Sequence, residues 1–107
     1  MHIFLAEYKS STTTISILDQ KGKAIANRDV EIPEYSFVNK LTKELIELSH
    51  EQELYHDDIF GIGVVANYGT LKFQSKEEFQ QHLESSFGFL AVVDVNKENV
   101  IENLLSS

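Results

Sequence analysis

The first segment whose residue types could bind a ligand is the polar turn Lys9-Ser10-Ser11, which follows an apolar run. A lysine beside hydroxyl groups occurs in phosphate-binding loops, where the ammonium group and backbone amides hold phosphate oxygens. Such loops need glycines so that the backbone can approach the phosphates closely, and this turn has none. We therefore interpret it as a hydrophilic hairpin turn.

A second candidate is a group of carboxylates. Glu7 and Asp94, together with Glu44 or Glu47, could hold two Mg²⁺ ions in a nuclease centre, since carboxylates are the hard oxygen ligands that Mg²⁺ prefers. Such a centre usually also takes an acid from the end of the fourth strand, where residues 65–67 read Val-Ala-Asn. The helix glutamates are more simply a solvated face, and we expect no metal here.

Two histidines near the middle of the chain are a third candidate. His50 and His56 flank a loop that also carries Asp57 and Asp58, and two imidazoles with a carboxylate can bind zinc. Their spacing of six residues puts them on no common helical face. Loop histidines are usually solvated, so the sequence predicts no metal site.

Composition excludes several classes of protein. The chain has 107 residues, no cysteine, and 17 acidic against 9 basic residues, a net charge of −8. One domain covering residues 1–107 is expected. A binder of nucleic-acid backbone needs a basic surface, so direct nucleic-acid binding is not expected. No apolar run approaches the roughly 18 residues of a membrane span, and the N-terminus lacks the features of a signal peptide. We expect a cytoplasmic protein without membrane contact.

The hydrophobic pattern predicts three strands first. Residues 2–7 form an apolar run typical of a strand that is buried on both faces. Residues 12–18 are rich in β-branched residues, and residues 23–32 follow a turn in which Gly22 supplies a positive φ. The third strand alternates imperfectly because Arg28 shares a face with apolar residues, which favours an edge position.

Helices and strands then alternate. Helices are predicted at residues 36–52 and 76–86, strands at 59–66 and 89–95, a short extended piece at Thr70–Phe73, and a last helix capped by Asn96. Later strands that arrive through helical crossovers lie parallel to the first. The predicted class is α/β, in the order β-β-β-α-β-α-β-α, with helices on the faces of a mixed five-stranded sheet. This is the topology of the ribonuclease H-like (actin-like ATPase) fold.

Three local patterns stand out: the Asp19-Gln20-Lys21-Gly22 hairpin, the Gly61-Ile62-Gly63 strand, and Phe87-Gly88 followed by a strand that ends near Asn96. In these patterns the whole chain resembles the N-terminal lobe of the ROK family (repressor, open reading frame, kinase), which includes sugar kinases and sugar-responsive repressors of the xylose and N-acetylglucosamine type.

The positions at which this sequence departs from the family pattern imply that catalytic function is lost. The family's Asp-x-Gly-Gly-Thr-Lys turn is replaced by residues 7–12 without glycine, so the resemblance leaves a degenerate phosphate loop at Lys9, Ser10 and Ser11. The family's catalytic base is the Asp of an Asn-Asp pair, and Val95-Asn96 stands there instead. An amide cannot act as a general base. The second lobe is absent from this sequence. We expect no enzyme activity and no cofactor.

The leading hypothesis is a non-catalytic ROK-like domain from a bacterial sugar-responsive transcriptional regulator, or a remnant of one. The alternatives are a protein-interaction or dimerisation module with no ligand, and half of a split sugar kinase. Asn67, Asn96 and Glu98 are the candidate ligand-binding residues because ligands of open α/β sheets lie beyond the carboxyl ends of the strands. Helix capping and turn formation are the simpler roles for these three. The expected partners are a sugar or a second lobe.

The last helix also predicts self-association. Val100, Ile101, Leu104 and Leu105 are four large apolar residues at the end of the chain. An exposed apolar patch usually finds a partner. A homodimer built on this helix or on the edge strand at residues 23–32 is therefore expected.

Overall fold

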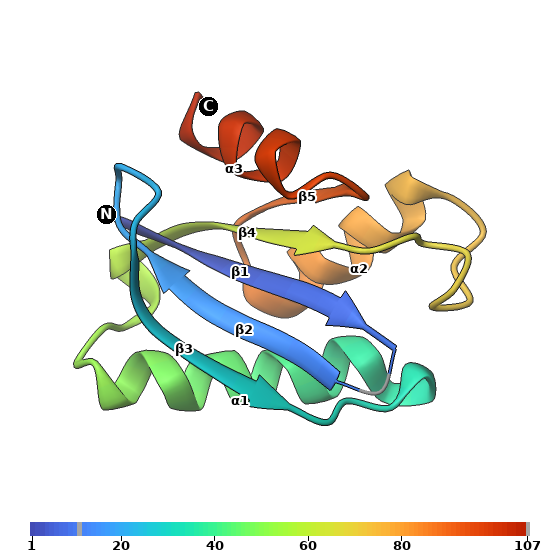
Figure 1. Cartoon of the computed structure of the whole chain (residues 1–107), viewed down its shortest axis with the longest axis horizontal. Coiled ribbons are helices and arrows are strands. Elements are labelled where there is room, and N and C mark those ends of the chain that lie inside the picture. Colours follow the sequence, from blue (N-terminus) through green and yellow to red (C-terminus); the bar gives the residue numbers. More distant parts are fainter. Residues whose placement is uncertain (11, 107) are drawn as a thin grey trace.

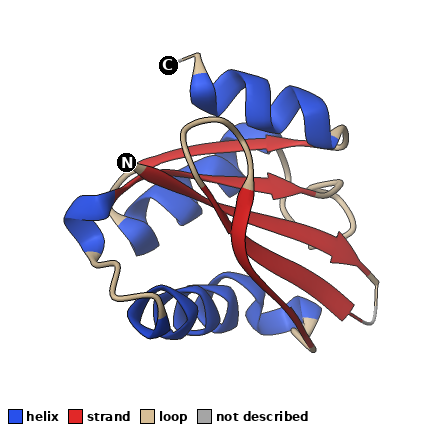
Figure 2. Cartoon of the chain, turned by 60° about the vertical axis from the view of Figure 1, so that its left-hand side comes forward, coloured by secondary structure: helices blue, strands red, loops and turns tan. Residues whose placement is uncertain are grey.

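The computed structural model describes residues 1–10 and 12–106. They form a mixed five-stranded sheet with helices on both faces (Figure 1, Figure 2). The elements, in chain order, are β1 (His2–Lys9), β2 (Thr12–Leu18), β3 (Ala24–Val30), η1 (Glu34–Ser36), α1 (Phe37–Glu51), η2 (His56–Asp58), β4 (Ile59–Val65), α2 (Lys76–Phe87), β5 (Leu90–Asp94) and α3 (Lys97–Leu105). The predicted order of strands and α-helices is confirmed.

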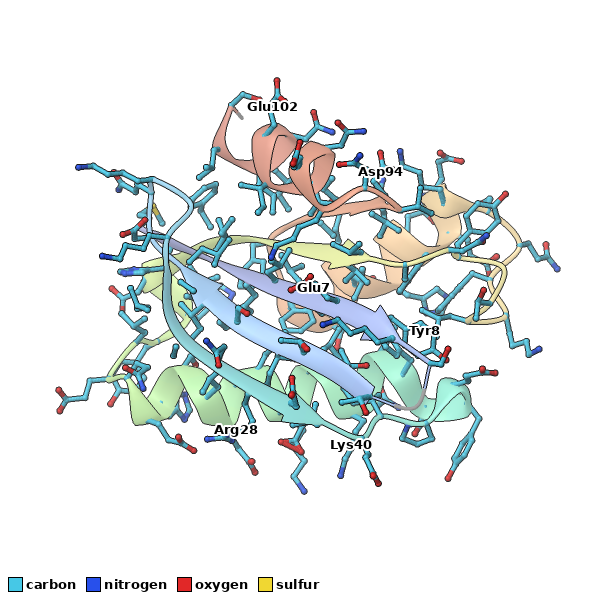
Figure 3. The ribbon with its side chains drawn as sticks, viewed as in Figure 1. Glu7, Tyr8, Arg28, Lys40, Asp94 and Glu102 are labelled. Atoms are coloured by element: carbon cyan, nitrogen blue, oxygen red, sulfur yellow. The ribbon has the colours of Figure 1, made fainter. Side chains whose placement is uncertain are left out.

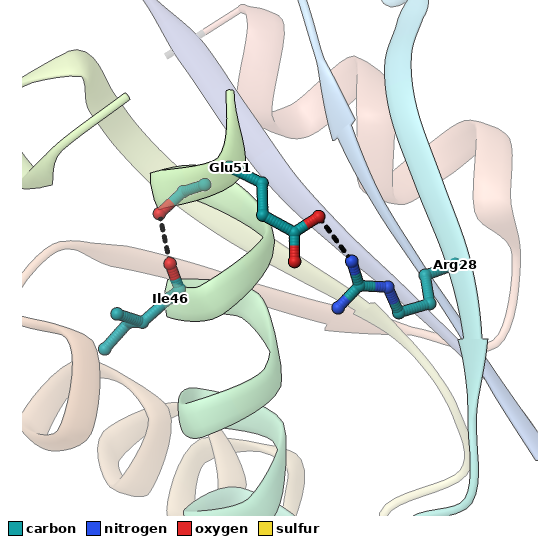
Figure 4. Close-up of polar contacts among 4 residues, drawn as sticks. Arg28, Ile46 and Glu51 are labelled. Carbon is teal, nitrogen blue, oxygen red and sulfur yellow. Dashed lines mark hydrogen bonds and ion pairs between the residues drawn. The ribbon is translucent and has the colours of Figure 1, made fainter. Parts of the chain in front are cut away.

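The strand order across the sheet is β3-β2-β1-β4-β5. β1 pairs antiparallel with β2 and parallel with β4, and β4 pairs parallel with β5. The predicted edge position of β3 is confirmed. Its Arg28 lies on the α1 side of the sheet and donates a hydrogen bond to Glu51 at the end of α1 (Figure 4). This ion pair explains why a charged residue interrupts the apolar face of the strand.

The β2–β3 hairpin has the predicted turn. Gly22 adopts φ +82° and its amide donates to the Asp19 carbonyl at 3.0 Å. The Asp19 carboxylate accepts hydrogen bonds from the amides of Lys23 and Lys21 at 3.0 and 2.9 Å. These bonds favour the ionised form, so the pKa of Asp19 lies below its ordinary value.

Helix ends follow the capping rules. Ser75 Oγ accepts from the Glu78 amide at 3.0 Å, while the Glu78 carboxylate accepts from the Gln74 amide at 2.9 Å. Gly88 ends α2 in the left-handed conformation, at φ +83°. Among the described residues, no helix combines the length and apolar character needed to cross a membrane.

The two faces of the sheet carry separate apolar clusters. On one face, α1 and α2 pack over all five strands around Phe37, Leu41, Leu45, Phe79 and Leu83, which are almost completely buried. On the other face α3 covers β4 and β5 (Figure 2). Both faces of β1 and β4 are therefore covered by helices at their centres, as their continuous apolar runs predict.

The terminal helix does not present the exposed apolar patch expected from its sequence. Val100 and Leu104 are fully buried against Ile3, Leu5 and Leu18, and Ile101 and Leu105 are half-buried beside them. Burial of each aliphatic side chain contributes about 1.5–3 kcal/mol, so the helix is held by its own sheet. The apolar surface available for a homodimer through this helix is therefore smaller than expected, and the outer edge of β3 has no neighbouring strand among the described residues. Self-association stays a prediction.

The extended piece expected at Thr70–Phe73 is wrong. The amides of Thr70, Leu71 and Lys72 each donate to the carbonyl three residues earlier, at 3.1–3.2 Å, so this segment is a series of turns. Leu71 is buried in the larger cluster and anchors the segment. A single apolar residue among turn-forming neighbours resembles a short strand in sequence.

A small residue at position 63 should be essential for the packing of α3. A Cβ atom added to Gly63 would overlap Val100 Cγ1 and lie 2.9 Å from Leu104 Cδ1. We expect Gly63→Ala to reduce the free energy of unfolding by about 1–3 kcal/mol, the cost of overpacking. Chemical denaturation measures it.

Two further variants control that experiment. Gly69→Ala adds the same methyl group in a loop, 3.3 Å from Asn67 Oδ1, and should cost less. Val100→Ala should partly rescue Gly63→Ala, because the two substitutions share one contact. Equal losses at positions 63 and 69, with no rescue, would contradict this account of the helix packing.

Candidate functional site

The carboxyl ends of β4 and β5 meet at one edge of the sheet because the strands are parallel. Val65 and Asp94 are register partners, and the Ala66 amide donates to the Asp94 carbonyl at 3.0 Å just beyond them. The chain then leaves β4 for the turns at residues 67–73 and leaves β5 for α3. This edge is where the sequence predicts a ligand site.

A shallow depression of about 230 Å³ opens at this edge. It is lined by Ala66, Asn67, Tyr68, Lys76, Val93, Asp94 and Val95. Asn67 Oδ1 accepts from the Gly69 amide at 2.9 Å, which fixes the side chain and leaves the amide nitrogen as the donor end. Tyr68 is 39% exposed and Lys76 is exposed at the start of α2. The depression therefore combines an amide, a carboxylate, an ammonium group and an aromatic ring.

Of the three predicted ligand-binding residues, only Asn67 lines the depression. Asn96 is the N-cap of α3, and its Oδ1 accepts from the Asn99 amide at 3.1 Å. Glu98 lies exposed in the first turn of the same helix, where a negative charge complements the helix dipole. Asn96 and Glu98 thus have structural roles outside the depression.

The structure does not bring together the carboxylates considered for a two-metal centre. Glu7 follows Ile3 and Leu5 on the α3 face of β1, while Glu44 and Glu47 belong to α1 on the opposite face. Glu7 Oε2 instead lies 3.5 Å from Lys97 Nζ. Asp94 Oδ1 accepts from the Val95 and Asn96 amides at 2.6 and 3.2 Å. Figure 3 labels both carboxylates, Glu7 and Asp94. The two carboxylates on the shared face are thus bound by the chain itself.

A tight turn connects β1 and β2. Lys9, the last residue of β1, pairs with Thr12, the first residue of β2. Ser10 is exposed and adopts φ +64°, a conformation that glycine would adopt more easily. Lys9 is also exposed, and the predicted role of Ser11 falls outside the described residues. The predicted hydrophilic hairpin turn is confirmed at Lys9 and Ser10.

Tyr8 ties this turn to the start of α1. Its hydroxyl donates to Glu34 Oε1 at 3.1 Å, and its ring lies 5.6 Å from that of Phe37. Partial burial, followed by the hydrogen bond to the Glu34 carboxylate and the negative charge of that group, raises the pKa of Tyr8. The phenol therefore stays protonated at neutral pH and holds the end of β1 in place.

The histidines do not form a metal centre with their acidic neighbours. His50 contacts the ring of Tyr55, and His56 Nε2 lies 3.1 Å from the Phe87 carbonyl. Within residues 1–10 and 12–106, no group of three or more His, Asp or Glu side chains is arranged to hold a metal ion.

Sequence reasoning missed Tyr68, Lys76 and Asp94 as members of the depression. The position of Asp94 at a strand end was a usable signal, because parallel strand ends share an edge. Lys76 lies nine residues from Asn67 in a different element. Only the turns at residues 67–73 bring it to the depression, and periodicity does not reveal them.

No family model matches the sequence of this chain, and no curated protein matches it.

Solved structures do match its fold. A ROK family transcriptional regulator, a homologue of the E. coli MLC protein, superimposes with a TM-score of 0.63 at 12% identity over 87% of this chain and 27% of that chain. A ROK family protein from Streptococcus pneumoniae TIGR4, in complex with sucrose, gives 0.55 at 17% identity over 88% of this chain and 34% of that chain.

A third match is to a protein from Bacteroides thetaiotaomicron described as having an actin-like ATPase fold. Its TM-score is 0.58 at 10% identity over 99% of this chain and 37% of that chain. The fold is therefore ribonuclease H-like, of the actin-like ATPase type, and its structural neighbours include ROK family proteins. This chain spans between about a quarter and two fifths of their lengths.

The role of Asn96 as a helix cap can be tested by two substitutions. Asn96→Ala removes the acceptor for the Asn99 amide and should reduce the free energy of unfolding by about 1 kcal/mol. Asn96→Asp keeps an acceptor and adds a favourable charge at the helix N-terminus, so it should match or exceed the wild type.

Thermal or chemical denaturation measures the difference. Glu102→Ala, on the exposed side of the same helix, serves as a control and should change stability by less than about 0.5 kcal/mol. If Asn96→Ala proves as stable as this control, Asn96 does not act as a cap.

Proposed function

We propose that this chain is a non-catalytic ROK-like domain that acts by binding a sugar, as part of a sugar-responsive transcriptional regulator or as a remnant of one. The observation that carries the non-catalytic part is the β1–β2 connection. Lys9 pairs with Thr12, and Ser10 beside Lys9 adopts φ +64° with a side chain where glycine would let the backbone amides approach phosphates closely. Phosphoryl transfer depends on positioning the phosphates, and this turn does not supply it.

The depression at the ends of β4 and β5 supports a sugar as the ligand. Sugars present hydroxyl groups that both donate and accept, and C–H faces that pack on aromatic rings. The Asn67 amide nitrogen and Lys76 ammonium would donate, Asp94 would accept, and the exposed face of Tyr68 would contact the ring. The match to a ROK family protein in complex with sucrose supports the same ligand class.

The first test of this proposal uses nucleotide. We expect the chain not to bind Mg-ATP at micromolar concentration, as measured by isothermal titration calorimetry. A double variant, Lys9→Gly with Ser10→Gly, restores two glycines to the turn and tests whether their absence prevents binding. Micromolar affinity in the wild type would overturn the non-catalytic assignment, whereas binding only in the double variant would support the missing glycines as its cause.

The second test uses sugars. In a ¹H–¹⁵N NMR titration with a panel that includes sucrose, xylose and N-acetylglucosamine at about 10 mM, enough to detect millimolar affinity, we expect shifts at Ala66, Asn67, Tyr68, Asp94 and Val95. Tyr68→Ala should weaken binding about fivefold or more, by loss of the ring face.

Asn39→Ala, which removes an exposed amide on α1 that does not line the depression, should leave sugar affinity unchanged. If no sugar of the panel shifts these amides, the sugar assignment is wrong, while the nucleotide result stands by itself.

A further inference from the structure

A small cavity lies at the end of the sheet opposite the depression, where β1 and β4 begin. It occupies about 120 Å³ between the C-terminal parts of α1 and α2. Phe4, Phe87 and Phe89 form one side of it, and Ser49 and His50 of α1 contribute to the other. Nothing in the proposed sugar site uses these residues.

The walls of the cavity are held in place by ring contacts. The centroids of Phe4, Phe87 and Phe89 lie 5.6–5.9 Å from one another. His56 packs on Phe89 at 5.5 Å, and its Nε2 lies 3.1 Å from the Phe87 carbonyl. A carbonyl can only accept, so this nitrogen carries the proton and the imidazole is oriented by the bond. The cavity is thus preformed rather than dependent on a ligand.

Ser49 contributes a polar group to the cavity, and its hydrogen bond within α1 decides whether it can donate to a ligand or accept from one. Its side chain is buried, at 3% exposure, and its hydroxyl donates to the Ile46 carbonyl at 2.8 Å, the bond drawn above the Ile46 label in Figure 4. A hydroxyl has one proton and two acceptor lone pairs. Because the proton is already used within α1, Ser49 can offer a ligand only an acceptor.

We propose that this cavity binds a small molecule of the phenol class, with one aromatic ring and one hydrogen-bond donor. A cavity of about 150 Å³ lined by apolar side chains accepts benzene, and a volume of about 120 Å³ suits a single ring and little more. The ring would contact the three phenylalanines, and its hydroxyl would donate to Ser49 Oγ. His50 and Tyr55, whose rings lie 5.1 Å apart, form the exposed rim.

The test is an NMR titration with phenol and with fluorobenzene, which has a similar ring but no donor. We expect both to shift the amides of Ser49, His50 and Phe89, and phenol to bind about fivefold more tightly, the ratio that one hydrogen bond confers. Ser49→Ala keeps the space and removes the acceptor, so it should abolish the preference for phenol.

Filling the cavity provides an independent check. Ser49→Leu should prevent binding of both probes, while Ser85→Leu, which adds the same bulk on the exposed side of α2 outside the cavity, should leave binding unchanged. The amide spectrum of each variant without ligand verifies its fold. Absence of shifts in the wild type, or a phenol preference that survives Ser49→Ala, would overturn the proposal.

N-Acetyltyrosinamide distinguishes a free phenol from a tyrosine side chain of a protein partner. It presents the same ring and hydroxyl attached to a peptide backbone, for which the small cavity has no room. We expect it to bind at least tenfold more weakly than phenol. Equal binding would show that the cavity serves a protein partner and would overturn the assignment to a small molecule.

Discussion

The close approach of α3 to β4 is the contact on which the second face of the sheet depends. Gly61 and Gly63 leave room for Leu104 and Val100 to lie directly on the strand, and a Cβ at either position would meet them at less than van der Waals separation. The helix can then bury both side chains against Ile3, Leu5 and Leu18. Without this contact one face of β1 and β4 would be exposed to water, although their sequences are apolar on both faces. The glycines therefore decide whether two central strands can be buried at all.

Burial of β1 and β4 on both faces also explains where ligand-binding groups can lie. The centres of these strands have no room for polar side chains, so such groups gather where the strands begin and end. At the carboxyl ends of β4 and β5 the chain turns outward, and the depression there is open and polar. At the starting ends the helices close over the strands, and the cavity is lined by phenylalanine and histidine rings. One covered sheet thus has two ends of different chemistry.

The sequence predicted the elements well because each has a local cause. The apolar runs of β1 and β4, the turn at Gly22, the cap at Ser75 and the stop at Gly88 all depend on residues close in the chain. Non-local consequences were harder to predict. The sequence suggested that Val100 and Leu104 would be exposed. The space over Gly61 and Gly63 that accommodates them is evident only once the strand and the helix are placed together. The positions of Lys76 in the depression and of Ser49 in the cavity were not predicted for the same reason, because they depend on how separate elements are placed together. Asn96 was predicted both as a cap and as a ligand residue, and its hydrogen bond to the Asn99 amide supports the cap.

The net charge of the chain bears on both proposed ligands in the same way. A net charge of −8 opposes the approach of a polyanion such as a nucleoside triphosphate, because a long-range field of the same sign lowers its local concentration. Lys9 adds positive charge at the β1–β2 turn, but it is exposed, and salt screens a single exposed ammonium within about 8–10 Å.

Neutral molecules are not affected by this field. A sugar in the depression and a phenol in the cavity are both neutral at physiological pH, so their binding would rest on hydrogen bonds and ring contacts. Such binding changes little with ionic strength, in contrast to any residual attraction of phosphate groups to Lys9. The overall acidity of the chain and the absence of glycine from the β1–β2 turn therefore both support the proposal that the ligands are small uncharged molecules rather than nucleotides.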